Sequence, residues 1–195
     1  IENRLAGDVR FVRTREGAAG LWSLTFKTPP DATGKQEAVV LDNHSGGAVR
    51  LTSERVRNGA DFVWSGLGLP GEAGVVDVRA EVRLEAGAGA SAWRLKVTNR
   101  SKRFGLWSSD YPLLCGVAAP GVAEVLLPRG NWGGTLLPRH RSAYAGRYPS
   151  FGCPLQMLAF NLGEAGLYLA AHDGAARAKE LVVTRSQDVT FRLLA

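Results

Sequence analysis

Six side chains in the second half of the chain have the chemistry to bind a sugar. A sugar ring presents an apolar C–H face and a rim of hydroxyl groups, so it is recognised by an aromatic plane with polar groups around it. Trp132 lies in a glycine-rich stretch, 128–134, where small neighbours leave room for a ligand to approach the indole. The predicted carbohydrate-binding residues are Arg129, Trp132, Arg147, Tyr148, His172 and Asp173.

Two interpretations of these aromatic residues stay open at this point. Trp132 and Tyr148 could stack on a sugar, or they could fill the seam between a sheet and a loop or a contact with a further domain. The surrounding segment, 128–173, combines aromatic residues, glycines, prolines and arginines between two clear strands. Because long irregular connections in compact domains usually carry function, we expect the binding surface within this segment.

Glycoside hydrolysis would need two carboxyl groups, one protonated and one ionised, on either side of the scissile bond. Asp110 and Asp173 are the acidic residues that stand at strand ends beside aromatic residues or histidine. A turn-forming role explains both, since Asp110 precedes Tyr111-Pro112 and Asp173 precedes Gly174. We therefore assign no catalytic residue.

Sugar isomerisation would need a general acid and a general base beside the anomeric centre. His140 and His172 are the histidines of this half of the chain, and Glu164 is the accompanying carboxylate. His140 lies between Arg139 and Arg141, whose charges would lower its pKa. The set is incomplete, so isomerisation remains an alternative and not the main prediction.

The sequence indicates neither a metal site nor a cofactor. His44, His140 and His172 are far apart and have no ligand at metal-binding spacing. Cys115 and Cys153 are likewise isolated, which favours two buried free thiols over a disulfide.

Composition fits one sizeable domain, residues 1–195, with an ordinary core. The chain has 195 residues of which 45% are hydrophobic, and it has no apolar run of about 18 residues that could span a membrane. The net charge of +6 is dispersed, and its densest group, 100–103, is short and interrupted. Nucleic-acid binding is therefore not expected, and cellular location stays open.

Strand alternation recurs along the whole chain, whereas no window shows a helical period. Residues 76–85 and 93–98 alternate apolar and charged side chains around a Gly-Ala-Gly-Ala turn, which predicts a hairpin with one wet face and Glu81 near Arg94. The other expected strands are 9–15, 21–27, 38–42, 48–53, 61–65, 104–109, 122–127, 155–162, 166–171, 180–185 and 189–194.

This pattern predicts an all-β fold of two antiparallel sheets packed face to face. Trp22, Trp93 and Trp107 stand at apolar strand positions and are expected in the core, with Trp64 less clearly placed. The last run, 188–195, ends without a turn signal, so we expect the chain to be cut from something longer or to close a sheet edge.

Five motifs in a fixed order resemble a known family. The motifs are Trp22-Ser23-Leu24, residues 93–101 (WRLKVTNRS), Leu127-Pro128-Arg129-Gly130, Tyr148-Pro149-Ser150 and residues 166–173 (GLYLAAHD). Together they resemble the N-terminal β-supersandwich, galactose-mutarotase-like, of large glycoside-hydrolase-like proteins of the endo-α-N-acetylgalactosaminidase type. The resemblance spans most of the chain and rests on order and spacing, because each motif alone is weak.

The resemblance implies an accessory domain that binds carbohydrate or braces a catalytic (β/α)₈ barrel. That barrel would belong to the parent protein, since no βα alternation occurs here. The alternative is a self-sufficient sugar-binding protein or a mutarotase-like sugar isomerase. Carbohydrate and the catalytic barrel are therefore the expected partners.

Overall fold

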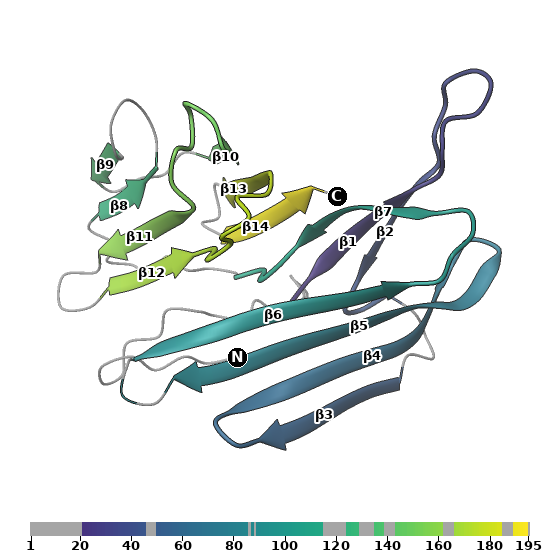
Figure 1. Ribbon diagram of the computed structural model, residues 1–195, viewed down its shortest axis with the longest axis horizontal. Helices are drawn as coiled ribbons and strands as arrows, with labels where there is room; N and C mark the ends of the chain where they lie inside the picture. Colours follow the sequence, from purple (N-terminus) through teal and green to yellow (C-terminus); the bar gives the residue numbers. More distant parts are fainter. Residues whose placement is uncertain are drawn as a thin grey trace. The chain divides into compact units, whose positions relative to one another are not determined.

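The computed structural model describes residues 21–45, 50–85, 87, 89–114, 124–128, 135–138, 143–161, 166–184 and 189–194, with the backbone alone at 50–53 and 135–138. Strands β1 to β14 account for most of these residues, and no helix occurs among them (Figure 1). All strand pairs with a defined register are antiparallel. The prediction of an all-β, antiparallel fold is therefore confirmed.

The chain divides into two compact units, which are described separately. One unit contains residues 23–109, and the other contains residues 21–22 and 110–194, each with the gaps given above. The prediction of a single domain over 1–195 stays a prediction.

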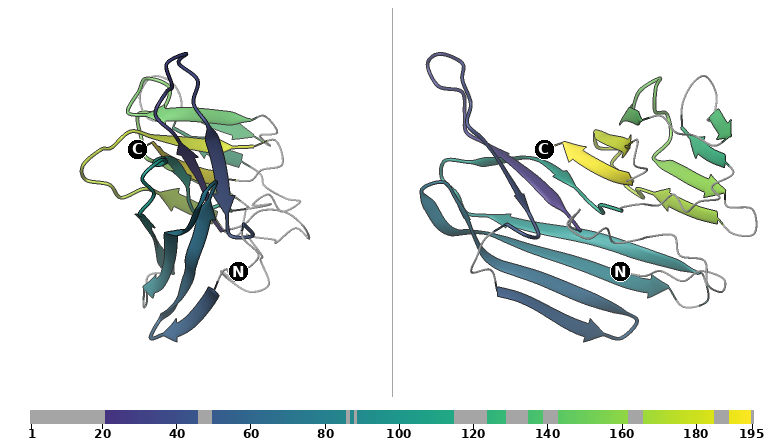
Figure 2. Two further views of the ribbon diagram at one scale, coloured as in Figure 1. Left: turned by 90° about the vertical axis from the view of Figure 1, so that its right-hand side faces the viewer. Right: turned by 180° about the vertical axis from the view of Figure 1, so that it is seen from behind.

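The 23–109 unit contains a long four-stranded sheet in the order β3-β4-β5-β6, with β3 at Arg50–Val56, β4 at Gly59–Leu69, β5 at Glu72–Glu85 and β6 at Ala90–Asn99. Three further strands lie in the order β7-β1-β2, with β1 at Ser23–Lys27, β2 at Ala38–Asp42 and β7 at Gly105–Asp110. Figure 2 shows the connection between β1 and β2 extending well beyond these two strands.

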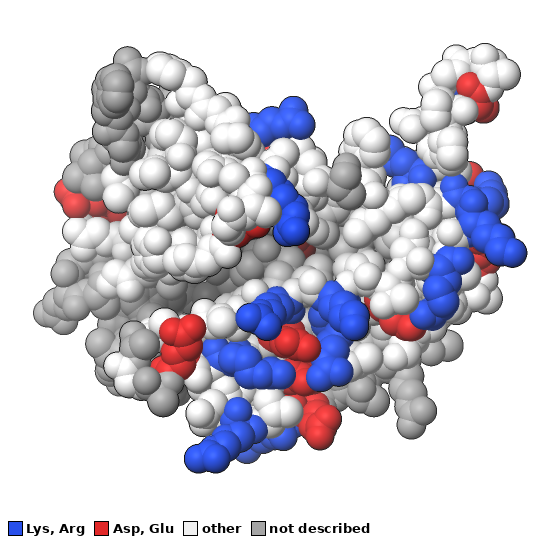
Figure 3. Space-filling model, viewed as in Figure 1, with Lys and Arg blue, Asp and Glu red and all other residues white. Residues whose placement is uncertain are grey.

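The predicted hairpin is β5–β6, and one of its faces is exposed to solvent, as expected. Glu81 lies opposite Arg94 in the register. The same face carries Asp61, which is 3% exposed and forms ion pairs of 2.5 Å with Arg79 and with Arg83. Figure 3 shows basic and acidic side chains interspersed over this face, as expected for a solvated sheet surface.

The 110–194 unit contains two sheets around one core. The first has the order β12-β11-β8-β9, with β8 at Glu124–Leu127, β9 at Thr135–Pro138, β11 at Met157–Asn161 and β12 at Gly166–Ala170. The second has the order β10-β13-β14, with β10 at Tyr144–Tyr148, β13 at Lys179–Val183 and β14 at Val189–Leu194. Alternate residues of both sheets meet in one cluster that includes Leu127, Leu158, Phe160, Leu181 and Val183.

Most expected strands are found, with boundary shifts of a few residues. The largest difference is β4, which runs for eleven residues where 61–65 was expected. Its extension passes through two register shifts against β5, between Trp64 and Leu69, which the sequence pattern does not reveal. The expected strand at 9–15 lies outside the described residues.

The segment 128–173 contains more strand than the two expected stretches, 155–162 and 166–171. It contains β9, β10, β11 and the whole of β12, and neither β9 nor β10 was expected. In β10, Tyr144, Gly146 and Tyr148 face inward while Ala145 and Arg147 are exposed. Glycine at an inward position hides the alternation, because hydropathy does not reveal that Gly146 belongs to the core face.

Of the three tryptophans expected in the core, Trp22 is buried, Trp93 is half-buried and Trp107 is exposed. Trp22 is fully buried and Trp64 is 5% exposed, whereas Trp107 is 48% exposed. On β7 it is Ser108, 7% exposed, that faces inward. The prediction that Trp107 belongs to the core is therefore wrong, because the apolar character of a strand residue does not fix which face it occupies.

Candidate functional site

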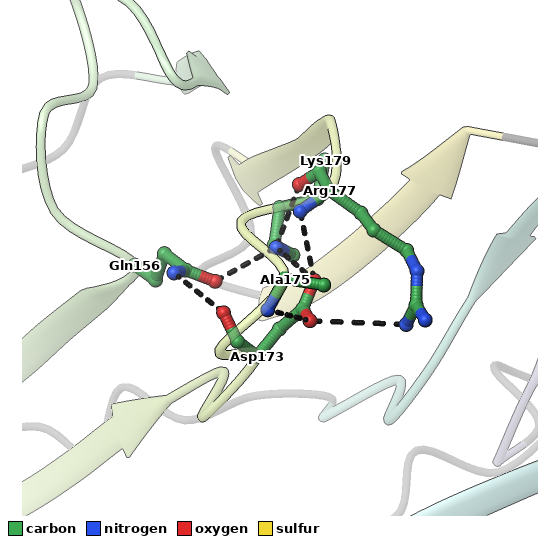
Figure 4. Close-up of polar contacts among 5 residues, drawn as sticks. All are labelled: Gln156, Asp173, Ala175, Arg177 and Lys179. Carbon is green, nitrogen blue, oxygen red and sulfur yellow. Dashed lines mark hydrogen bonds and ion pairs between the residues drawn. The ribbon is translucent and has the colours of Figure 1, made fainter.

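A buried lysine organises the polar end of the 110–194 unit (Figure 4). Lys179, the first residue of β13, is 3% exposed. Its ammonium group donates hydrogen bonds to Gln156 Oε1 at 2.7 Å, Asp173 Oδ2 at 3.0 Å and the Arg177 carbonyl at 2.7 Å. The Tyr148 ring centroid lies 5.0 Å from the same nitrogen, so three acceptors and a π face surround one cation.

Asp173 builds the turn that precedes β13, as the sequence predicted. Its carboxylate accepts backbone hydrogen bonds from Ala175 at 3.0 Å and Arg177 at 2.9 Å. The hydrogen bond from Lys179, reinforced by these two amides, holds the pKa of Asp173 below its usual range. A carboxylate held ionised in this way is unsuited to act as the general acid of a glycosidase.

The structure brings two of the six predicted sugar-binding residues together. Tyr148 and Asp173 both contact Lys179, which gives each side chain a structural role, and their contact with a sugar stays a prediction. His172, next to Asp173, is exposed, and Arg147 is exposed on the other face of β10. Arg129 and Trp132 lie outside the described residues, so their role stays a prediction.

Arg147 belongs to a row of charges across the second sheet. The register places Arg147 opposite Glu180 and Glu180 opposite Arg192. Arg192 binds Asp110 through Nε at 2.7 Å and Nη2 at 3.1 Å, and its Nη1 lies 3.5 Å from Glu180. This bidentate ion pair gives the Asp110 side chain a structural role within the sheet.

Asp110 and Asp173 do not form a catalytic pair. Asp110 is bound by Arg192, which shares its sheet face with Glu180, whereas Asp173 is bound by Lys179 on the core face of β13. Adjacent residues of a strand point to opposite faces, so Lys179 and Glu180 direct the two aspartates to opposite sides of the sheet.

The outer face of the first sheet carries an exposed aromatic residue that the sequence analysis did not single out. Tyr168, on the edge strand β12, is 57% exposed and lies opposite Ala159 of β11. Two residues further along β11, Asn161 donates a hydrogen bond of 3.0 Å from Nδ2 to Glu124 Oε2 of β8. We call Tyr168, Ala159, Asn161 and Glu124 the Tyr168 face.

Period-two alternation could have identified both Tyr168 and Lys179. Leu167 is 8% exposed and belongs to the core cluster, with Leu169 packed against it, so the residue between them must face outward. Lys179 precedes Leu181 and Val183 at the same spacing, which places a lysine on an apolar face. A lysine in such a position must find acceptors when buried.

Cys153 is a free thiol and fully buried, as expected. Burial raises the pKa of this thiol, which keeps it protonated and unreactive. Cys115 lies outside the described residues, and so do His140 and Glu164 of the isomerase alternative.

Within the described ranges, no three His, Cys, Asp or Glu side chains gather where they could hold a metal ion. The same ranges contain no helix long and apolar enough to cross a membrane.

Comparison of the chain with protein-family models, with curated proteins and with solved structures gives no match.

Acid titration provides a test of the Asp173 turn. Because the pKa of Asp173 is lower in the folded protein than in the unfolded chain, its contribution to stability is present above about pH 4 and is lost as pH falls through the folded pKa. We expect Asp173→Asn to have a lower melting temperature than the unsubstituted protein at pH 7. This difference in melting temperature should shrink below pH 4. Melting temperatures measured by circular dichroism from pH 7 to pH 2.5 check this, and a constant difference would contradict it.

Proposed function

We propose that this chain binds carbohydrate on the Tyr168 face of its 110–194 unit. The observation that carries the proposal is the exposure of Tyr168, 57%, on a sheet face whose facing neighbour is Ala159. An exposed aromatic ring offers an apolar plane on which the C–H face of a sugar can stack. An alanine opposite the ring leaves space above the sheet for a flat ligand.

Polar side chains near Tyr168 could form hydrogen bonds with the hydroxyl groups of a sugar. Asn161 lies diagonally across from Tyr168, and such diagonal neighbours are about 7–8 Å apart. That distance fits a ring stacked on Tyr168 with its hydroxyl groups directed at the Asn161–Glu124 pair. The hydrogen bond between these two side chains orients the pair before a ligand arrives.

The resemblance to glycoside-hydrolase-like proteins supports the same class of ligand. On this proposal the chain adopts the galactose-mutarotase-like supersandwich and serves as an accessory domain beside a catalytic barrel of the parent protein. The antiparallel sheets and the motifs at 127–130, 148–150 and 166–173 support it. Arg147 and His172, both exposed, are retained as further contacts, and so are Arg129 and Trp132.

Bracing of a catalytic barrel is the second candidate function. Phe151 is 75% exposed and Leu155 is 39% exposed, and both belong to the turn region that follows β10. Exposed apolar side chains at a turn suit contact with another domain. The self-sufficient alternative, a sugar-binding or isomerising protein, is distinguished by whether the coding region continues past Ala195 into a stretch with βα alternation.

Replacement of Tyr168 by alanine tests the main proposal. We expect about a tenfold loss of affinity for neutral oligosaccharides, the scale of one aromatic stacking contact and its buried area. The melting temperature should change little, because the ring is mostly exposed. Isothermal titration against a panel of neutral tetrasaccharides measures the affinity.

Two matched variants sharpen this test. Tyr168→Trp keeps an aromatic plane and should retain binding, whereas Phe151→Ala removes an exposed ring elsewhere and should leave glycan affinity unchanged. Equal losses of glycan affinity in Tyr168→Ala and Phe151→Ala would contradict a specific binding site on the Tyr168 face. Unchanged binding in Tyr168→Ala would refute the proposal for this face.

A further inference from the structure

We infer a second binding site in the 23–109 unit, which takes the carboxylate of an acidic sugar. The site is an open cleft of about 730 Å³ between the β1–β2 connection and the turn that precedes β7. Its lining residues are Thr28, Pro29, Asp31, Lys35, Glu37, Lys102 and Arg103. The assignment of a sugar as the ligand rests on the proposed function, whereas the assignment of an anion rests on the cleft alone.

One wall of the cleft is the β1–β2 connection, which its own hydrogen bonds hold in shape. The Thr28 amide donates to the Glu37 carbonyl at 3.0 Å, and the Glu37 amide donates to Thr28 Oγ1 at 3.0 Å. At the tip, Asp31 accepts hydrogen bonds from the backbone and hydroxyl of Thr33 and from the Lys35 amide, at 2.7–3.0 Å. The wall is therefore built before any ligand binds.

The opposite wall holds Arg103 in a fixed orientation. Its Nη1 donates to the Pro70 carbonyl at 3.1 Å, and its Nη2 donates to Glu37 Oε2 at 3.1 Å. The guanidinium carbon also lies 5.1 Å from the centroid of the Phe104 ring. Arg103 thus joins the two walls and neutralises Glu37.

The remaining charge in the cleft is positive. Both carboxylates are engaged, Asp31 by three hydrogen bonds and Glu37 by Arg103. Lys35 and Lys102 form no ion pair within the described residues. Asp31 keeps its own charge, so the three cations and two carboxylates of the lining leave one positive charge in excess. Glu72, outside the lining, accepts a hydrogen bond of 3.1 Å from the Lys102 amide and not from its ammonium group. Two ammonium groups without an ion pair and a net positive lining suit a carboxylate ligand.

An exposed tryptophan beside the cleft supplies a stacking surface. Lys27, which precedes the cleft residue Thr28, places Nζ 3.9 Å from the centroid of the Trp107 ring. Trp107 is 48% exposed on β7, a hydrogen-bonded neighbour of β1. Lys27 covers one face of the indole, so a sugar carrying a carboxylate would stack on the opposite face.

Binding of tetragalacturonate tests this inference. The double variant Lys35→Glu/Lys102→Glu should lose about tenfold to a hundredfold in affinity at low salt, because two charge-assisted contacts become repulsive. Trp107→Ala should lose about fivefold, the scale of one stacking contact, and keep the salt dependence. Lys96→Glu is the matched control, because Lys96 is exposed on the outer face of β6, and it should lose at most about twofold, the scale of an exposed charge.

Three results would overturn the inference. The first is binding of the methyl ester of the same tetrasaccharide as tightly as the acid. The second is a loss of affinity in Lys96→Glu as large as in the double variant. The third is failure of the unsubstituted protein to bind tetragalacturonate. Tyr168→Ala separates this inference from the proposed function. That variant should keep its affinity for tetragalacturonate even where it loses affinity for neutral glycans.

Discussion

Replacement of Gly146 by alanine is expected to destabilise the 110–194 unit by about 3 kcal/mol, the upper range for overpacking a close-packed core. A Cβ atom at this position would lie 2.0 Å from Tyr144 Oη, 2.5 Å from Tyr144 Cζ and 2.9 Å from Cys153 Cβ. The Tyr144 ring folds over Gly146 so that its hydroxyl donates a hydrogen bond of 2.9 Å to the Gly152 carbonyl. The added methyl group must therefore displace a buried ring or the turn that holds it.

Thermal unfolding measures this effect, with Gly174→Ala as the matched control. No atom lies within 4 Å of a Cβ built on Gly174. Gly174→Ala should therefore have the same melting temperature as the unsubstituted protein. For a chain of this size, a 3 kcal/mol loss corresponds to a decrease of roughly 6–12 °C. In a Tyr144→Ala background the cost of Gly146→Ala should fall, because the main obstacle is gone. Equal melting temperatures for the two glycine variants would contradict this account of β10.

Lys179→Met should also cost about 3 kcal/mol, the low end of the range for removing one member of a buried ion pair. The variant keeps the apolar stem but removes the cation shared by Gln156, Asp173 and Arg177. Asp173, with a side chain 18% exposed, is then left without its lysine. The low end applies because that carboxylate keeps some contact with water.

A double-mutant cycle identifies the ion pair as the cause. Lys179→Met combined with Asp173→Asn should recover part of the lost stability, because no uncompensated charge remains. Lys96→Met removes an exposed lysine and should leave the melting temperature unchanged. Additive effects of Lys179→Met and Asp173→Asn would show that the cluster in Figure 4 does not couple them.

The sequence predicts the β5–β6 hairpin well because two signals agree there. Alternation sets the faces, and the glycine-containing turn sets the register that brings Glu81 opposite Arg94. The turn before β13 was predicted for the same reason, since Asp173-Gly174 is local turn chemistry. Both features depend on residues that are close in sequence.

Features that depend on tertiary packing were missed. Lys179 is separated from Gln156 by 23 residues, and Arg192 from Asp110 by 82. Nothing local indicates that these side chains meet. Sequence reasoning also grouped Arg147 with Tyr148 as sugar ligands, although adjacent strand residues must face opposite sides.

Exposure was the other property that could not be predicted from residue type. Trp107 and Tyr168 are both aromatic residues on strands, and both are about half exposed or more. Both rings point outward because an adjacent residue of the same strand faces the core: Ser108 on β7 and Leu167 on β12. Alternation settles the direction at Tyr168, whereas at β7 a polar residue faces inward and reverses the expected pattern.

Nuclear magnetic resonance mapping of a neutral oligosaccharide tests the central claim most directly. The account predicts that ligand-induced shifts concentrate at the Tyr168 ring and the Asn161 side-chain amide, on the outer face of β11 and β12. Core-face signals such as those of Leu158 should stay in place. Shifts confined to other surfaces, or no shifts at millimolar ligand, would contradict it.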